Sequence, residues 1–163
     1  MAYEYLDQLI SDCKKAKNIR PLNTLIIQHG ERIPDCLDKK TGIYVITEVG
    51  GDPEKTLEDM QAAKWPNGDK KAKTYMPRVN ESSQTIYVGS SENLKQRLEE
   101  HIGEPASTTY ALRMGNGWFK GKWRIEIEVY DLKKVKKALI LLAEDNRAFE
   151  LKPAFGKPGP NGK

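Results

Sequence analysis

The sequence has few of the residues that build zinc sites and disulfide frameworks. It contains two cysteines and two histidines among 163 residues. Cys13 and Cys36 lie 23 positions apart with no second pair, so their spacing does not assemble a structural zinc site. We therefore expect reduced thiols and a cytoplasmic protein.

Long apolar runs and a dominant sign of charge are also missing. The longest strongly apolar stretch, 138–143, is far too short to span a bilayer, and segment 1–15 lacks an apolar core of signal-peptide length. A net charge of +4 only mildly favours a polyanionic partner. With 38% hydrophobic and 31% charged residues, the composition argues against full disorder and predicts one globular domain with its own core.

Three runs have the pattern of β-strands in a small α/β fold of the α+β kind. The runs 42–47 and 85–89 are rich in β-branched and aromatic residues, which is typical of buried strands, and we expect them to form a hairpin. The run 123–132 alternates apolar and charged residues, as a half-buried strand does. Residues 21–33 fit a short helix or a strand equally well.

Helical periodicity predicts several further elements. Ser107 or Thr108 should cap a short helix that runs to Met114. Asp131 should cap a helix over 132–151 that Pro153 stops, and its segment "ALILLA" is apolar on every side, which predicts central packing. The other expected helices span 2–17, 56–64 and 93–102.

The predicted hairpin encloses an unusually long connection, residues 48–84. More than thirty residues of weak structural signal inside a compact domain indicate a functional excursion or a partly disordered loop. We therefore expect a single domain over 1–163. Its parts are a helical N-terminal extension (1–40), a core (41–156) with the insertion 48–84, and a flexible tail (157–163).

Five side chains in these elements carry chemistry. Tyr44 and Tyr87 lie on the two hairpin strands, Arg97 and His101 lie one turn apart on the next helix, and Glu144 lies on the last helix. Each taken alone has an ordinary structural explanation, such as a core tyrosine or a hydrogen-bonded histidine. A carboxylate in a centrally packed helix, however, costs free energy unless a cation meets it, and a metal ion would supply that cation.

Taken together, these residues resemble the GIY-YIG nuclease family. "GIY" stands on the first strand and "YVG" on the second, the arginine follows the second tyrosine by ten residues, and the histidine comes one turn later. Glu144 precedes Pro153 by nine residues, which matches the family's metal-binding glutamate better than Asp145 does. The resemblance covers roughly 41–47 and 85–156 and implies a small domain with a central three-stranded antiparallel sheet.

The resemblance implies metal-dependent hydrolysis of phosphodiester bonds. Glu144 would hold one Mg²⁺ or Mn²⁺ ion, and Arg97 would bind the scissile phosphate with its planar fork. A tyrosine would be the general base, and the resemblance leaves open which one. We favour Tyr44, with His101 sharing the proton transfer or hydrogen-bonding the phosphate.

The chain departs from the family pattern at three places. The hairpin connection is long, Ser90 stands where many members have a lysine, and Gly156 stands where an asparagine is usual. If that lysine helps to lower the pKa of a tyrosine, another cation must replace it. The candidates are Lys73, Lys95 or another lysine of the insertion.

The insertion combines basic and aromatic residues. Between positions 64 and 80 there are five basic residues and one acidic residue, and two aromatic residues are interleaved with them. We expect this loop to grip DNA, double-stranded DNA more than RNA, although a solvated variable loop has the same composition. The residues expected to contact DNA are Lys64, Trp65, Lys70, Lys71, Lys73, Arg78, Ser90 and Lys95.

The leading functional hypothesis is a metal-dependent DNA endonuclease of the stand-alone restriction or defence type. A palindromic target would require two copies, as a homodimer on DNA, or sequential nicking. The alternatives are a DNA-repair nuclease, a nucleic-acid-binding module that kept the fold without cutting, and a structural partner protein with no nucleic-acid role.

Overall fold

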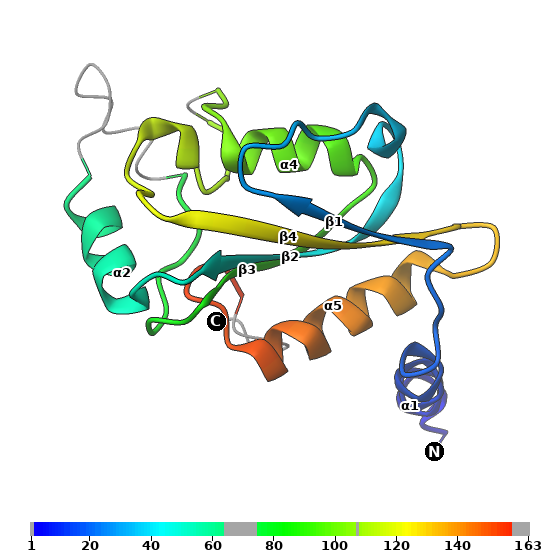
Figure 1. The fold of residues 1–163 in the computed structure, drawn as a ribbon. Helices are drawn as coiled ribbons and strands as arrows, with labels where there is room; N and C mark the ends of the chain where they lie inside the picture. The colour runs from blue at the N-terminus through cyan, green and yellow to red at the C-terminus, as the bar shows by residue number, and fades with distance from the viewer. Residues whose placement is uncertain (1, 64–74, 107, 158–163) are drawn as a thin grey trace.

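A computed structural model describes residues 2–63, 75–106 and 108–157. In this structure an antiparallel sheet of four strands has the order β1-β4-β2-β3 and carries helices on both faces (Figure 1). The strands are β1 (Asn23–Gln28), β2 (Thr41–Val49), β3 (Thr85–Ser91) and β4 (Lys122–Tyr130).

Helix α4 covers one face of the sheet and α5 covers the other (Figure 1). Helix α1 packs against α5, so it lies on the same side of the sheet. Within the described residues, every helix is too short or too polar to cross a membrane. The α-helices are α1 (Glu4–Ala16), α2 (Pro53–Gln61), α4 (Leu94–Ile102) and α5 (Lys137–Leu151), and short 3₁₀ helices span Asp35–Leu37 and Met114–Asn116.

Strand β2 is buried on both faces, which explains why its sequence is a continuous apolar run. Tyr44 and Ile46 point into the main core with the apolar residues of α4. Ile43 packs on the other side with Ile140 of α5. This central position places the Tyr44 ring directly under α4.

The α+β fold and the hairpin are confirmed, because β2 and β3 pair antiparallel across the insertion. The prediction of three strands is wrong. Residues 23–28, which the sequence left undecided, form β1 and pair along their whole length with β4. The N-terminal part of the chain is therefore not only helical, since it supplies an edge strand of the sheet.

Two helix predictions are also wrong. Among residues 108–116, only Met114–Asn116 are helical, as a single 3₁₀ turn after Arg113, whose φ of 53° is left-handed. Helix α5 begins at Lys137 rather than at 132, because Lys136 is extended and Asp131 instead closes a turn by accepting a hydrogen bond from the Lys133 amide.

The expectation that the last helix packs centrally is wrong as well. In α5 only Ile140 and Ala148 are buried, whereas Leu141 and Phe149 are 43% and 61% exposed. The helix therefore lies on the sheet with one face open to solvent. Its C-terminal end is as expected, with Lys152 in the left-handed conformation before Pro153.

Candidate active site

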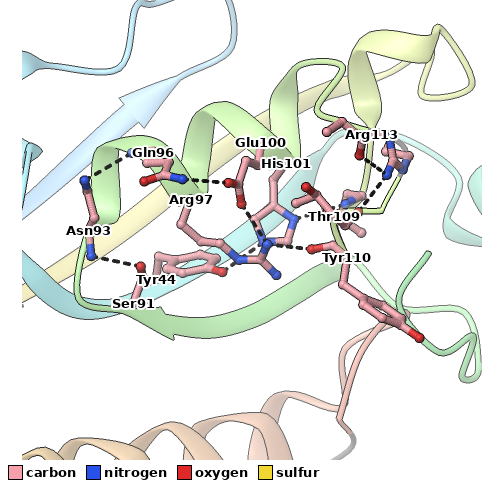
Figure 2. A network of polar contacts seen from close by, with 12 residues as sticks. Tyr44, Ser91, Asn93, Gln96, Arg97, Glu100, His101, Thr109, Tyr110 and Arg113 are labelled. Atoms are coloured by element: carbon pink, nitrogen blue, oxygen red, sulfur yellow. Dashed lines mark hydrogen bonds and ion pairs between the residues drawn. The ribbon is translucent and has the colours of Figure 1, made fainter. Parts of the chain in front are cut away.

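Tyr44 and His101 form a buried pair between β2 and α4. The Tyr44 hydroxyl oxygen lies 2.9 Å from Nε2 of His101, and the two residues are 1% and 0% exposed (Figure 2). The other ring nitrogen, Nδ1, accepts a hydrogen bond of 3.1 Å from the backbone amide of Leu112. Both nitrogens of the histidine therefore already have partners.

These two contacts fix the proton on the imidazole. Burial, with a further effect of Arg97, holds the pKa of His101 well below its ordinary value, so the ring is neutral at neutral pH. Because Nδ1 accepts from Leu112, the single ring proton resides on Nε2, and His101 donates to the Tyr44 oxygen. This bond orients Tyr44 and would stabilise its phenolate.

Tyr87 lies beside this pair on β3. Its ring stacks on that of Tyr44, with centroids 6.1 Å apart, and contacts the His101 ring with centroids 4.5 Å apart. The "YVG" glycine makes this possible, because a Cβ on Gly89 would lie 2.5 Å from the Tyr44 oxygen and 2.7 Å from the Tyr87 ring. The motif glycine is thus required by close packing of the two tyrosines.

Arg97 extends from α4 beside Tyr44 (Figure 2). Its Nη1 pairs with Glu100 at 3.0 Å and donates to the carbonyl oxygen of Tyr110, and its side chain is 22% exposed. Burial lowers the pKa of the guanidinium, but Tyr44, Tyr87 and Glu100 together raise it by more. The group is therefore a permanent, partly desolvated cation next to both phenols.

Both phenols are weaker acids than free tyrosine. Burial raises the pKa of Tyr44 well above its ordinary value, and the neighbouring Tyr87 raises it further, while Arg97 lowers it. Burial likewise raises the pKa of Tyr87, against the lowering effect of Arg97. Removing a proton from either phenol at neutral pH thus requires positive charge beyond that of Arg97.

Glu144 of α5 faces the same group of residues. Its carboxylate accepts a short hydrogen bond from the Ser90 hydroxyl. Burial raises its pKa, the bond from Ser90 lowers it, the neighbouring Asp145 raises it, and Lys157 and Arg97 lower it. Since Glu144 also raises the pKa of both tyrosines, these side chains share one electrostatic environment.

The donor set suits a hard divalent cation. A buried carboxylate with a raised pKa gains from a cation, and the oxygens of Glu144 and Ser90 are hard ligands. Across residues 2–63, 75–106 and 108–157, three or more acidic, histidine or cysteine side chains do not gather at any point. Such an ion would therefore keep most of its ligands as water.

A family model described as the GIY-YIG catalytic domain matches residues 71–141. This segment of the chain is therefore similar to the GIY-YIG nuclease family. Members of this family are endonucleases, which supports a nuclease, and thus hydrolase, activity in general. The searches of curated proteins and of solved structures found no match.

The matched GIY-YIG segment contains Tyr87, Arg97 and His101 but neither Tyr44 nor Glu144. The fold brings these two residues to the others, Tyr44 through the pairing of β2 with β3 and Glu144 through the contact with Ser90. All five predicted catalytic residues therefore lie in one site. Their individual roles stay predictions.

The residues predicted to contact DNA divide into three groups. Ser90 lies in the site, and Arg78 is exposed beside it, its carbonyl accepting a hydrogen bond from Gly156. Lys95 points about 200° around α4 from Arg97 and pairs at 3.3 Å with Asp35. The others, Lys64, Trp65, Lys70, Lys71 and Lys73, lie outside the described residues.

Two residues near the site were missed by the sequence analysis. Lys157 is a cation close enough to lower the pKa of Glu144, whereas Lys95 pairs with Asp35. Asn80 of the insertion donates from Nδ2 to the carbonyl oxygens of Pro153 and Gly156, at 3.0 and 2.9 Å. Lys157 had been assigned only to a flexible tail, and no local pattern marks Asn80.

The departure at position 156 has a steric reason. Gly156 has a φ of +91°, and a Cβ there would lie 2.7 Å from the Tyr87 ring. An asparagine would therefore displace this tyrosine. Asn80 instead holds the same chain segment from the insertion side, so the long connection supports the site through its C-terminal half.

Proposed function

We propose that this chain is a metal-dependent DNA endonuclease. The observation that carries the proposal is that one guanidinium, Arg97, acts electrostatically on Tyr44, Tyr87 and Glu144 at the same time. A cation, a pair of phenols and a carboxylate around one point are the groups that phosphodiester hydrolysis needs. We place the enzyme among the restriction or defence nucleases, because the basic insertion would put the DNA grip within the catalytic domain.

Arg97 would bind the scissile phosphate. Its contacts with Glu100 and Tyr110 both use Nη1, so they hold the guanidinium in one orientation. An oriented fork binds two phosphate oxygens without a further loss of side-chain entropy. Because the group is partly desolvated, its attraction for the added negative charge of the transition state is stronger than in water.

Tyr44 would take the proton from the attacking water. His101 donates to its oxygen and Arg97 lies beside it, so both would stabilise the phenolate. When bound at Glu144, a Mg²⁺ or Mn²⁺ ion would neutralise a phosphate oxygen and the leaving oxygen. His101 would act through Tyr44, since its own two nitrogens are engaged.

A plasmid assay tests this proposal. We expect the wild-type protein to nick or linearise supercoiled DNA with Mg²⁺ or Mn²⁺, and end-sequencing of the products would locate the cuts. Arg97→Lys keeps the charge but loses the fork, so we expect cleavage to fall by about 100-fold or more. Arg32→Ala, which removes an exposed arginine paired with Asp35, should cleave normally.

A nucleic-acid-binding module without cleavage is the second candidate. The absent lysine at Ser90 and the raised pKa of both tyrosines favour it. A wild-type protein that shifts DNA in a gel yet never nicks it with either metal would establish binding alone. Equal cleavage by wild type and Arg97→Lys would contradict the proposed phosphate contact.

A further inference from the structure

Helix α1 carries an apolar stripe that the described part of the chain leaves largely exposed. Tyr5, Leu6, Leu9, Ile10 and Cys13 repeat at helical spacing, and all five are exposed. Leu6 is 49%, Ile10 54% and Tyr5 77% exposed. A stripe of this kind normally packs on a core, so its exposure indicates a surface that another molecule covers.

The contact of α1 with its own chain uses one edge of this stripe and the residues beside it. The half-buried residues of α1 are Ser11, Asp12 and Ala16, and the helix has no buried residue. Helix α1 meets α5 beside the sheet (Figure 1), and the α1 side chains that are partly covered are small or polar. Most of the apolar stripe is thus left exposed, unlike that of an ordinary surface helix.

The charges at the edge of the stripe show what kind of partner fits. Acidic residues, Glu4 and Asp7, occupy the first turn, and basic residues, Lys14 and Lys15, occupy the last. Asp7 and Lys14 are two turns apart, so they lie on the same edge of the stripe. In an antiparallel pair of α1 helices, Asp7 of each copy would lie beside Lys14 of the other.

We propose that α1 pairs antiparallel with α1 of a second copy of this chain, which makes the protein a homodimer. A two-fold interface uses the same surface of both copies, so that surface must complement itself. The apolar stripe of α1 and the charges at its edge meet this requirement. The pairing buries both stripes together. It does not depend on whether the chain cleaves DNA, although two copies would supply one site for each strand of a duplex.

Light scattering coupled to size-exclusion chromatography tests the interface on the full chain over a range of concentrations. We expect a concentration-dependent dimer. Leu6→Glu or Ile10→Glu should raise the dimer dissociation constant by about 100-fold or more, because each places a charge in the buried apolar stripe of both copies. Val49→Glu is the matched control, since Val49 is 46% exposed at the end of β2, and it should leave the dimer intact.

A charge exchange tests the antiparallel register. Asp7→Lys or Lys14→Asp alone should raise the dissociation constant by roughly ten-fold, because each alters two symmetry-related pairs. Mixing these two variants should restore association as a heterodimer, since every pair then joins lysine to aspartate. The double variant should dimerise with itself.

Three results would overturn the proposal. The first is a wild-type monomer at every concentration up to the solubility limit. The second is a Leu6→Glu protein that dimerises as the wild type does. The third is binding of α1 to anionic phospholipid vesicles, abolished by Leu6→Glu, from a protein that stays monomeric. Circular dichroism would confirm that each variant is folded.

Discussion

Replacing Glu144 by glutamine should raise stability while it abolishes cleavage. The substitution keeps the shape and the acceptor for the Ser90 hydroxyl but removes the charge. Folding raises the pKa of Glu144, chiefly through burial, so the ionised carboxylate destabilises the metal-free protein at neutral pH. The cost is about 1.4 kcal/mol for each unit by which the pKa rises.

The sign of the pH dependence follows from this pKa. A carboxylate with a raised pKa opposes folding at pH values above that pKa. This penalty disappears as the pH falls below the ordinary value of 4.5. The excess free energy of unfolding of Glu144→Gln over wild type should therefore be largest at neutral pH and shrink in acid.

Magnesium should reverse the order of stability. At 100 times its dissociation constant, an ion that binds only the folded protein adds about 2.7 kcal/mol, or roughly 5 to 10 °C in Tm for a chain of this size. Wild type should show this gain and Glu144→Gln should not. Cleavage of supercoiled plasmid by the variant should fall by about 100-fold or more.

Asp145→Asn is the matched control on the adjacent residue of α5. Asp145 raises the pKa of Glu144, so its removal should leave cleavage within a few-fold of wild type and should preserve stabilisation by magnesium. Urea unfolding with and without magnesium measures the stability of each variant and its gain from the ion. Plasmid nicking measures cleavage. Equal loss in both variants, or full activity in Glu144→Gln, would refute the assignment of Glu144 as metal ligand.

Three further variants probe the site. Gly89→Ala brings a Cβ to 2.5 Å from the Tyr44 oxygen, and a shift of about 1 Å is needed to relieve this contact. Such a shift should reduce cleavage by about 100-fold in the plasmid assay, and unchanged cleavage would contradict the role of Tyr44. Folding lowers the pKa of His101, so its contribution to stability is complete above about pH 6.5 and is lost in acid. In urea unfolding, His101→Phe should therefore flatten the pH dependence of the unfolding free energy between about pH 7 and 5. Asn80→Asp places a negative charge against two carbonyl oxygens. In urea unfolding this variant should therefore be less stable than Asn80→Ala by about 1 to 3 kcal/mol, and the reverse order would exclude the two hydrogen bonds.

Local pattern in the sequence was sufficient for the elements that carry the site. Tyr44 and Tyr87 stand in β-branched runs whose burial follows from composition, and the hairpin joins them. Arg97 and His101 are four residues apart, so helical periodicity alone places them on one side of α4. The spacing from Glu144 to Pro153 selected the carboxylate that lies against Ser90.

Contacts between distant segments decided the rest, because no local period encodes the path of the chain. Strand β1 exists through its pairing with β4, about 100 residues away, and its own six residues left helix and strand open. The tautomer of His101 depends on a hydrogen bond from the backbone amide of Leu112. The position of Gly156 depends on a hydrogen bond from the Asn80 side chain to its carbonyl oxygen. The sequence by itself determined which groups are present and on which elements they lie, whereas the tertiary structure decided how they are oriented, protonated and held.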